Sequence, residues 1–494
     1  MDKLYKSTRG KQKPIDFYTS ILQGLGDDGG LLVPDFDFEK KNLKDLKNLN
    51  YVDLATEIIS SFTDESGKED IRSLIHKAYN TGLFDEEIVP VKKAGDLYVC
   101  ELFHGQTAAF KDMALSLLPH FMTYSLQQKG EKRDVMILAA TSGDTGKAAL
   151  EGFKNVKGTE IKVFYPLDGV SRIQKQQMVT TTGDNVEVIG IRGNFDDAQR
   201  AVKEAFSSPT LKDLCEKHHV FLSSANSINI GRLLPQIVYY FYAYFSLVND
   251  QVIKLGEEVN FTVPSGNFGN CLAGWIAKEM GLPVHRFIIA SNKNNILTDF
   301  FKTGLYDIRR EFFKTNAPAM DILVSSNLER LVYFMSHRDA LKIHEYMKEL
   351  NETGIYRIDE ELLKDIQKEF QANYLDENEI LDIIRLCFNK YHYLLDTHTA
   401  VGYGVYLKYR KETNDTVKTI LLSTASPYKF PESVYEALTG EKKDVYEAID
   451  QLYEKTGVMI PEPLKNMKDK EILHQGIINK EDILSFIGER IEEH

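Results

Sequence analysis

Two loops that contain glycine and small polar residues have the composition of anion-binding sites. The stretch VPSGNFGN covers Val263–Asn270, and the stretch ATSGDTG covers Ala140–Gly146. In each stretch glycine allows a tight backbone turn, and a helix is expected to begin at once. The N-terminus of a helix presents free N–H groups that favour phosphate. The pair of loops predicts a ligand with one phosphate, or two ligands that each carry one. A plain structural turn is the alternative for either loop alone.

The second loop also carries hydrogen-bonding side chains at the expected start of its helix. Ser142, Asp144 and Thr145 offer donors and acceptors there, although Asp at this place is also ordinary N-cap chemistry. The first loop lacks the GxGxxG pattern of a dinucleotide site. These loops therefore favour a phosphate-bearing ligand that is not a dinucleotide.

A third stretch, SANSINIGRLLPQ, places one arginine among apolar residues. It covers Ser224–Gln236 and adds Asn226 and Arg232 to the candidate site. A guanidinium in an apolar helix needs an anion, because burying an unpaired charge is costly. That anion is either a ligand or a structural Asp or Glu, and the pattern supports the two equally.

One lysine, Lys111, lies between a small-residue turn and an expected helix in the stretch HGQTAAFKDMA. Beside phosphate-ready loops, such a lysine predicts a Schiff-base cofactor such as pyridoxal phosphate. Lysine can hold that cofactor covalently and afterwards act as a base. The alternative is a lysine on a helix surface, paired with the neighbouring Asp112.

The elements that must position these loops alternate between strands and helices. Continuous apolar runs predict buried strands, and amphipathic helices separate them, which is typical of parallel sheets covered on both faces. In an open parallel sheet, ligands bind beyond the carboxyl ends of the strands, where these loops lie. The expected strands cover Asp134–Ala140, Ile161–Pro166, Asn185–Ile191, His219–Ala225, Glu257–Gly266, Val284–Asn292 and Val417–Ser426.

The flanks of this region differ from it. Residues 1–95 mix short helices with a turn and a short strand at Asp27–Pro34, residues 320–395 are mostly helical and charge-rich, and the C-terminus is expected to be a polar helical tail. The most apolar stretch, Ile237–Val248, is too short to span a membrane and predicts a buried helix.

Composition excludes several classes of function. The chain has 494 residues, 43% of them hydrophobic, and a formal net charge of -13. That charge argues against a nucleic-acid partner but not against a small anionic ligand. The N-terminal residues lack the apolar run of a secretory signal. Four scattered cysteines form no CxxC pair, so neither structural zinc nor a disulfide framework is expected, and the cytoplasm is the expected compartment.

The motifs in their order resemble those of the threonine synthase family, in its longer type found in many bacteria and in fungi. The resemblance runs nearly end to end. It is carried by YKSTRG (Tyr5–Gly10), GLGDDGGLLVP (Gly24–Pro34), ELFHGQTAAFKD, ATSGDTG, SANSINIGRLLPQ, VPSGNFGN, MDILVSSNLERL (Met320–Leu331), DTHTAVG (Asp396–Gly402) and LSTASPYKFP (Leu422–Pro431).

This resemblance implies a fold and a division into domains. The fold is α/β, of the tryptophan-synthase-β-like fold-type II of pyridoxal-phosphate enzymes, with two parallel-rich open sheets flanked by helices. An N-terminal domain would cover residues 1–95, and a small domain residues 131–224. A large cofactor-binding domain would cover residues 96–130 and 225–494, with a helical insertion at about 320–395.

The resemblance also implies a reaction, in which O-phospho-L-homoserine and water give L-threonine and phosphate by γ-elimination and β-replacement. Lys111 would bind pyridoxal phosphate and move protons, Thr424 would face the pyridine nitrogen, and Asp144 would approach the cofactor's O3′. The cofactor phosphate would lie against Gly266, Asn267, Phe268, Gly269 and Asn270. The candidates for substrate binding are Ser142, Thr145, Asn226 and Arg232, with Lys147 as a further one.

The chain departs from the family pattern at Gln106, Lys147, Thr397 and Ser426, which leaves the fine fit of the substrate open. His104 and His398 are expected to be structural. No metal, nucleic-acid or membrane partner is expected, and a monomer and a homodimer both fit the sequence. The rival functions are a threonine-synthase-like phospholyase, a serine/threonine dehydratase, and a non-catalytic sensor of a phosphorylated metabolite.

Overall fold

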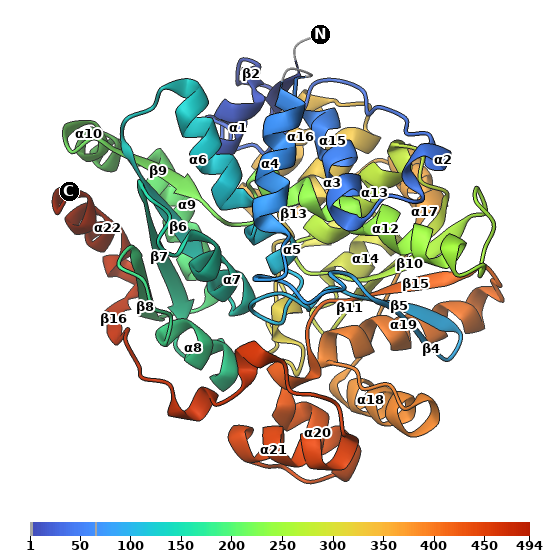
Figure 1. Cartoon of the computed structure of the whole chain (residues 1–494). Helices are drawn as coiled ribbons and strands as arrows, with labels where there is room; N and C mark the ends of the chain where they lie inside the picture. The colour runs from blue at the N-terminus through green and yellow to red at the C-terminus, as the bar shows by residue number, and fades with distance from the viewer. Residues whose placement is uncertain (1–2, 65–66) are drawn as a thin grey trace.

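A computed structural model describes residues 3–64 and 67–494 of the chain. Two separate parallel sheets form its framework, one on each side of the view in Figure 1. Helices lie against both sheets, as the alternating strands and helices of the sequence predict. The expectation of an α/β fold with two parallel-rich sheets is therefore confirmed.

The smaller sheet has five parallel strands in the order β16-β8-β7-β6-β9. Four of its strands were expected from sequence, each within a few residues of its observed bounds. The strands are β6 (Asp134–Ala140), β7 (Thr159–Pro166), β8 (Val186–Arg192), β9 (Val220–Ser224) and β16 (Gly476–Asn479). The helices that connect or flank them are α7 (Asp144–Phe153), α8 (Arg172–Val179), α9 (Phe195–Ser207) and α10 (Pro209–Lys217).

The larger sheet has six strands in the order β14-β11-β10-β15-β5-β4. All neighbours in it are parallel except β4, which runs antiparallel to β5 at the edge. Its strands are β4 (Val91–Ala94), β5 (Leu97–Glu101), β10 (Val259–Pro264), β11 (Val284–Ser291), β14 (Phe370–Tyr374) and β15 (Thr419–Ser423). The carboxyl ends of β10 and β15 carry two of the loops singled out from sequence.

The N-terminal residues form a small antiparallel sheet and several helices. The sheet contains β1 (Leu4–Ser7), β2 (Ile15–Asp16) and β3 (Leu32–Pro34), so the expected short strand at Asp27–Pro34 is confirmed. The helices are α1 (Phe17–Gln23), α2 (Leu43–Leu46), α3 (Tyr51–Ile59), α4 (Lys68–Ala78), and, further along, α5 (Asp112–Leu115) and α6 (Leu118–Lys129).

Residues 320–395 are mostly helical, as expected, but they also contain two strands. Here β13 (Ile355–Arg357) pairs with β12 (Leu305–Asp307), and β14 joins the edge of the larger sheet. The helices of this part are α14 (Ile296–Thr303), just before it, α15 (Leu328–Met335), α16 (Ala340–Thr353), α17 (Glu360–Glu369) and α18 (Glu377–Tyr391).

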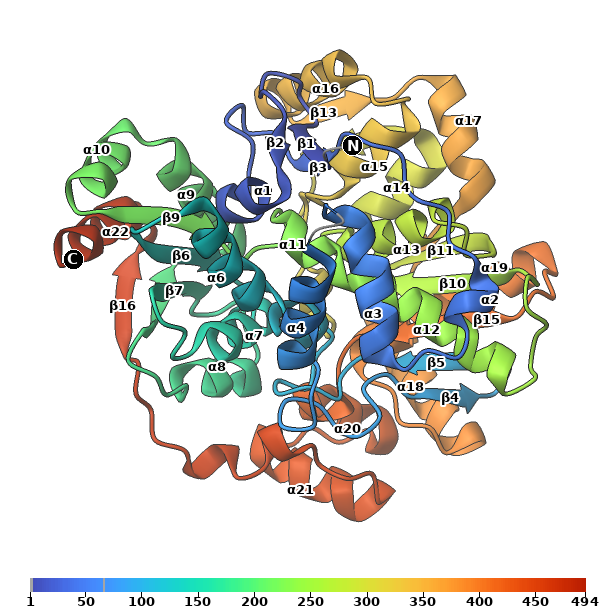
Figure 2. The same cartoon turned by 45° about the horizontal axis from the view of Figure 1, so that its top comes forward.

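The C-terminal residues pass from the larger sheet to the smaller one. After α19 (Thr397–Thr413), α20 (Pro431–Thr439) and α21 (Val445–Thr456), the chain runs along the bottom of Figure 2 to β16 and α22 (Ile483–Glu492). The expectation of a wholly helical tail was wrong at β16, which pairs with β8. The proposed domain bounds stay a prediction, but β16 and α22 lie with the smaller sheet and not with the larger one.

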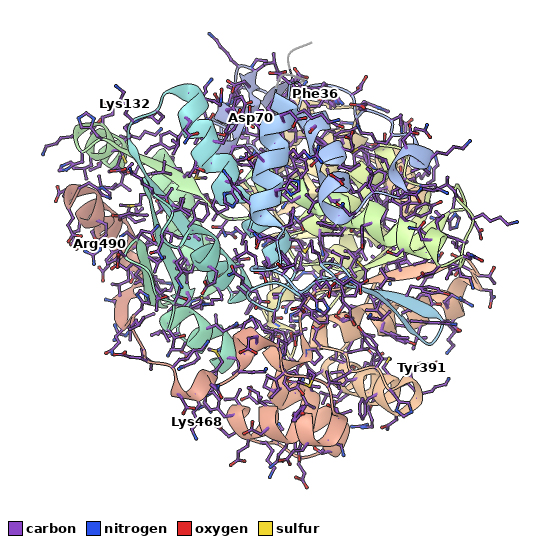
Figure 3. All side chains as sticks on the ribbon, in the orientation of Figure 1. Phe36, Asp70, Lys132, Tyr391, Lys468 and Arg490 are labelled. Carbon is purple, nitrogen blue, oxygen red and sulfur yellow. The ribbon has the colours of Figure 1, made fainter. Side chains whose placement is uncertain are left out.

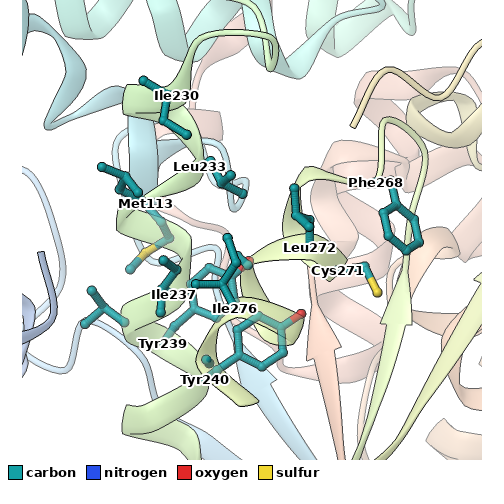
Figure 4. Close-up of a cluster of buried hydrophobic side chains, with 14 of the residues drawn as sticks. Met113, Ile230, Leu233, Ile237, Tyr239, Tyr240, Phe268, Cys271, Leu272 and Ile276 are labelled. Atoms are coloured by element: carbon teal, nitrogen blue, oxygen red, sulfur yellow. The ribbon is translucent and has the colours of Figure 1, made fainter. Parts of the chain in front are cut away.

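A buried helix cluster supports the loops of the candidate site. The apolar stretch expected as a buried helix is α12 (Pro235–Asn249), which follows α11 (Ile230–Leu233) and packs beside α13 (Gly269–Glu279). Figure 4 shows Met113, Leu233, Ile237 and Leu272 together in this cluster. Because α5, α11 and α13 share one core, the residues at their N-terminal ends are held in fixed relation to one another.

Charged side chains lie mostly at the surface. Asp70, Lys132 and Lys468, which Figure 3 labels, are exposed, whereas Arg330 and Lys429 are fully buried. All four cysteines are buried and free. No helix in the described ranges, 3–64 and 67–494, is both long and apolar enough to cross a membrane.

Candidate active site

One pocket collects the loops that the sequence singled out. It encloses roughly 800 Å³ of empty space, counting the open solvent at its mouth. Apart from the further candidate Lys147, every residue proposed from sequence for the cofactor or the substrate lines it. These are Lys111, Ser142, Asp144, Thr145, Asn226, Arg232, Gly266, Asn267, Phe268, Gly269, Asn270 and Thr424.

The loop between β10 and α13 is held in a strained turn. Phe268 adopts a left-handed conformation with φ of 63°, which is uncommon for a residue other than glycine. Two side-chain hydrogen bonds close the turn: Ser265 donates to Asn270 Oδ1 at 2.8 Å, and the Asn270 side-chain amide donates to the Pro264 carbonyl at 2.8 Å. These hydrogen bonds therefore hold the turn so that the N-terminus of α13 faces the pocket.

This loop fits the phosphate of the expected cofactor. Within the described chain, the backbone N–H groups of Gly266, Asn267 and Phe268 have no hydrogen-bond partner, and the side-chain oxygen of Asn267 is buried without one. Unpaired N–H groups before a helix attract an anion. Pyridoxal phosphate carries an anionic phosphate group, so the residues of this loop suit the cofactor.

A short segment, Ser325–Arg330, fixes the distance between the phosphate loop and the neighbouring loop at Ser227. Ser325 donates to the Gly266 carbonyl at 2.7 Å. The Asn327 backbone N–H donates to the Asn267 carbonyl at 3.0 Å, and its side-chain amide donates to the carbonyls of Asn267 and Ser227 at 3.1 and 3.2 Å. This segment was recognised as a motif in the sequence, but its positioning role was not.

The same segment connects the site to the N-terminal sheet. The buried guanidinium of Arg330 donates to the carbonyls of Leu32 and Ile228 at 3.1 and 2.6 Å. Glu329 accepts two hydrogen bonds from the guanidinium of Arg9 at 3.0 and 2.9 Å. The N-terminal residues therefore support the pocket from behind, which gives the STRG motif a physical reason.

We expect Gly266→Ala to weaken cofactor binding. An added methyl group at Gly266 would lie 2.9 Å from the Ala319 carbonyl oxygen, a backbone atom that cannot rotate away. Overpacking of this kind costs about 1–3 kcal/mol, so we expect the dissociation constant for pyridoxal phosphate to rise by about five- to 150-fold. Titration of the cofactor's absorbance measures it.

Gly476→Ala is the matched control for that variant, because a methyl group at Gly476 meets no atom within 4 Å. It should bind the cofactor as the unchanged protein does. Equal affinity in Gly266→Ala and Gly476→Ala would contradict the assignment of the loop to the phosphate.

Lys111 stands at the start of α5 with its amine in the pocket. Burial and the positive charge of Arg232 lower the pKa of Lys111 to about 7, and the amine lies 4.2 Å from the centre of the Phe110 ring. A lysine with such a pKa is poised to bind a carbonyl group and to exchange protons at neutral pH. The surroundings therefore fit the cofactor lysine.

The alternative, a surface pair between Lys111 and Asp112, does not match the geometry. The Asp112 carboxylate accepts hydrogen bonds from the backbone N–H and the hydroxyl of Thr107 at 2.8 and 2.7 Å. Burial raises the pKa of Asp112 to about 6. Asp112 therefore closes the loop that precedes Lys111 and leaves the lysine free to face the pocket.

Asp144 opens α7 at the wall of the pocket and is buried. Its Oδ1 accepts hydrogen bonds from the Gln174 side-chain amide and from the Lys429 ammonium group, both at 2.9 Å. Burial alone would raise the pKa of Asp144, but the charge of Lys429 and these hydrogen bonds lower it below its ordinary value. The carboxylate is therefore an anion at neutral pH.

Arg232 lies buried at the start of the helix cluster with an incomplete set of partners. One of its terminal nitrogens donates to the Ala225 carbonyl at 3.0 Å, and its Nε is buried without a partner. Burial lowers the pKa of Arg232 to about 10. Across residues 3–64 and 67–494 no carboxylate forms an ion pair with it. Of the two anions left open by the sequence, the geometry favours a ligand.

Asn226 has a second task that the sequence did not reveal. Its side-chain amide donates to the Ala140 carbonyl at 2.8 Å, and its Oδ1 accepts from the Ala140 N–H at 3.2 Å. These bonds join the loop after β9 to the end of β6. The side chain lines the pocket, but most of its hydrogen-bonding capacity is already used within the protein.

Thr424 lies directly beside the lysine loop. Its carbonyl accepts a hydrogen bond from the Phe110 N–H at 2.8 Å, and its buried side chain lines the pocket. Because this bond joins the end of β15 to the residue before Lys111, the two proposed cofactor contacts move together.

The two histidines have partners within the protein. His398 lines the pocket, but its Nε2 accepts the Ala319 N–H at 3.0 Å and its Nδ1 lies 3.0 Å from the Asp396 carboxylate. His104 lies between the carboxylates of Asp85 and Glu101, at 2.8 and 2.9 Å, outside this pocket. Both arrangements suit the structural role expected of these residues.

The lining of the pocket differs from the expected one at Lys147, Phe195 and Gln236, among others. Lys147 points away from the pocket, because its ammonium group binds Glu151 and Thr181. Phe195 and Gln236 line the pocket and were not expected from sequence. Phe195 comes from the smaller sheet's α9, and only the folded chain brings it to the loops of the larger sheet.

Comparison with known protein families gives matches that together cover residues 4–472. Residues 4–79 match the family described as threonine synthase N terminus, residues 80–425 that of pyridoxal-phosphate dependent enzymes, and residues 399–472 that of threonine synthase, C-terminal. The threonine synthase of Saccharomyces cerevisiae is 38% identical over 88% of this chain and 89% of its own length. The human protein named threonine synthase-like 1 is also 38% identical, over 85% of this chain but 58% of its own length.

Solved structures agree with these matches. The yeast threonine synthase superposes with a TM-score of 0.86 at 35% identity, over 100% of this chain and 98% of its own. The threonine synthase of Brucella melitensis with bound pyridoxal phosphate gives a TM-score of 0.85 at 35% identity, over 100% and 99% of the two chains. The family, the fold type and the cofactor expected from the motifs are all confirmed. The chain therefore belongs to the threonine synthase family of pyridoxal-phosphate-dependent enzymes.

Proposed function

We propose that this enzyme is a lyase that converts O-phospho-L-homoserine and water into L-threonine and phosphate. The observation that carries the proposal is one pocket with two places for an anion. The phosphate loop at Gly266–Asn270 suits the cofactor, and the guanidinium of Arg232, whose Nε has no partner among the described residues, suits the substrate's phosphate. A planar guanidinium binds phosphate through two parallel hydrogen bonds.

In this reaction the carbon–oxygen bond to phosphate breaks at the γ-carbon, and the oxygen of water is added at the β-carbon. Pyridoxal phosphate, when bound, supplies a ring that withdraws electrons from the substrate's α-carbon. Lys111, with its pKa near 7, takes the proton from the substrate's α-carbon and is placed to return protons to the substrate's other carbon atoms. Arg232 holds the phosphate while the bond to it breaks.

The remaining candidate residues lie around Lys111 and Arg232 and bind and orient the cofactor and the substrate. We assign the cofactor contacts to Lys111, Thr424, Asp144 and the N–H groups of Gly266, Asn267, Phe268, Gly269 and Asn270. We assign the substrate contacts to Ser142, Thr145, Asn226 and Arg232, with Asn226 acting mainly through the loop it holds in place. The buried, free cysteines support our further proposal that the enzyme works in the reducing cytoplasm.

The product separates this function from its rivals. Purified enzyme with pyridoxal phosphate and O-phospho-L-homoserine should release threonine and phosphate in equal amounts. A phospholyase would also release phosphate, but with 2-oxobutyrate and ammonia in place of threonine, and the similarity to the human threonine synthase-like 1 makes that assay necessary. A sensor without catalysis would give neither product and no cofactor absorbance near 410 nm.

We expect Thr424→Asp to change the chemistry more than the fold. A carboxylate facing the pyridine nitrogen would raise the pKa of that nitrogen and strengthen the ring as an electron acceptor. Side reactions such as transamination should then increase. The measurement combines the cofactor's absorbance spectrum, the yield of side products and a melting curve.

Thr424→Ser is the control for that variant, because it keeps a hydroxyl in the same place. Its spectrum and products should stay those of the unchanged enzyme. If Thr424→Asp also keeps them, Thr424 does not face the nitrogen and its proposed role fails.

A further inference from the structure

Lys429 is a buried lysine to which the reaction assigns no task. It ends a short turn of helix, Pro427–Lys429, just before α20, and its side chain is 0% exposed. A charged ammonium group in a protein interior is retained only when an anion and further acceptors surround it. The contacts of Lys429 therefore show what holds the charge there.

Its three partners come from three separate parts of the chain. The ammonium group lies 2.9 Å from Asp144 Oδ1 on α7, donates to Gln177 Oε1 on α8, and donates to the Thr107 carbonyl at 3.2 Å. Gln177 in turn donates to the same Thr107 carbonyl at 3.5 Å. One cation thus joins two helices of the smaller sheet to the loop before Lys111.

The loop before Lys111 is held by hydrogen bonds, so a bond at Thr107 affects the position of Lys111. The carboxylate of Asp112 accepts both the N–H and the hydroxyl of Thr107, and Asp112 directly follows Lys111. A displacement of Thr107 would therefore shift the start of α5 and with it the amine of Lys111.

The other side of the network reaches the pocket wall through Asp144. Gln174 on α8 binds the same oxygen of Asp144 as Lys429 does. Gly143 before it has φ of 133°, and any side chain there would collide with Gln174, at 2.3–2.6 Å. The sequence thus leaves room for this network at the loop that opens α7.

The titratable groups around Lys429 and Asp144 are Lys111 and Asp112 on the lysine loop and His398 on α19. Lys429 is the cation that bonds Asp144 directly, and Lys111 and His398 act on it only through space. Without Lys429, Asp144 would be a buried carboxylate whose remaining bonded partner, Gln174, is neutral.

We propose that Lys429 is a positioning residue of the active site. Its ammonium group keeps Asp144 as an anion at the pocket wall and holds α7 and α8 against the loop that carries Lys111. The inference rests on the proposed function only for the meaning of that pocket, because the network itself consists of contacts within the protein.

The first test uses the full-length chain without cofactor, so that it does not depend on catalysis. Lys429→Met, the double variant Asp144→Asn with Lys429→Met, and the unchanged chain are melted from pH 5 to pH 8. In the single variant the folded pKa of Asp144 should rise above its unfolded value. A raised carboxyl pKa gives stability that is lost as pH rises through it, so the deficit in melting temperature should grow with pH.

The double variant removes the unpaired carboxylate and should restore a constant difference from the unchanged chain across this range. Lys147→Met is the matched control. Lys147 lies on α7 and, like Lys429, is buried, but it pairs with Glu151, which is only half-buried. Its deficit should depend little on pH. A deficit of Lys429→Met that does not vary with pH would overturn the inference.

The second test uses the enzyme with its cofactor. Loss of a bonded cation raises a carboxyl pKa by about 1–3 units, so the acidic limb of kcat/KM and of the cofactor's absorbance should move upward by at least about one unit in Lys429→Met. Lys147→Met should leave both profiles in place. Unshifted profiles in Lys429→Met would show that the lysine only fills space. If the unchanged enzyme makes no threonine, the proposed function fails while the melting test still decides on Lys429.

Discussion

Lys111→Ala should make no measurable threonine from O-phospho-L-homoserine. Lys111 is the one lysine among the residues lining the described pocket, and its pKa of about 7 allows it to take and return protons at neutral pH. Positioned proton transfer alone contributes about 10²–10⁴-fold to a rate. Loss of the covalent link to the cofactor adds to this, so a fall of several orders of magnitude is expected.

The measurement is steady-state formation of threonine, beside the cofactor's absorbance near 410 nm. The variant should bind pyridoxal phosphate only reversibly, and small primary amines added to the assay should restore part of the rate. Lys147→Ala is the control, since this buried lysine binds Glu151 and Thr181 instead of facing the pocket. Near-normal threonine formation by Lys111→Ala without added amine would remove Lys111 from the mechanism.

The loops of this site were predictable because their signals are local. Each consists of a buried strand, a turn of glycine and small polar residues, and a helix, which follow one another directly in the chain. Because the carboxyl ends of parallel strands converge, the loops after β6, β9, β10 and β15 meet in one pocket. Residue patterns along the chain therefore identified eleven residues of its lining without coordinates, and the family resemblance added Thr424.

The strands that escaped prediction include β14 and β16, whose own sequences carry little signal. β14 has five residues, FQANY, in a helical and charged region, and β16 has four, GIIN, in a polar tail. Both lie at the edges of their sheets. An edge strand is covered on fewer sides, so its sequence needs no continuous apolar run, and tertiary pairing decides its conformation.

Lys429 could not be assigned for a different reason. It lies within a recognised motif, but its partners Thr107 and Gln177 are 322 and 252 residues away in the chain. Whether a lysine is buried depends on such distant partners, and the residues around it in the sequence do not show them. Arg330 is similar, because its donors meet carbonyl groups that any residue type supplies.

Arg232→Lys should lower kcat/KM for O-phospho-L-homoserine by one to two powers of ten. The guanidinium is 3% exposed and keeps an unpartnered Nε in the site, so it can present two parallel donors to a phosphate. Lysine keeps the charge but lacks this planar pair of donors. A hydrogen bond to a charged group contributes roughly 1.5–3 kcal/mol, which corresponds to that fall in kcat/KM.

Pyridoxal phosphate should stay bound in Arg232→Lys, and the melting temperature should change little, because the Arg232 side chain makes one hydrogen bond within the described residues, to the Ala225 carbonyl. Arg330→Lys is the matched control: its guanidinium is also buried, but it is bonded to the carbonyls of Leu32 and Ile228. That variant should melt early. If Arg232→Lys melted early with unaltered kinetics, its anion would be structural and the phosphate of the substrate would bind elsewhere in the pocket.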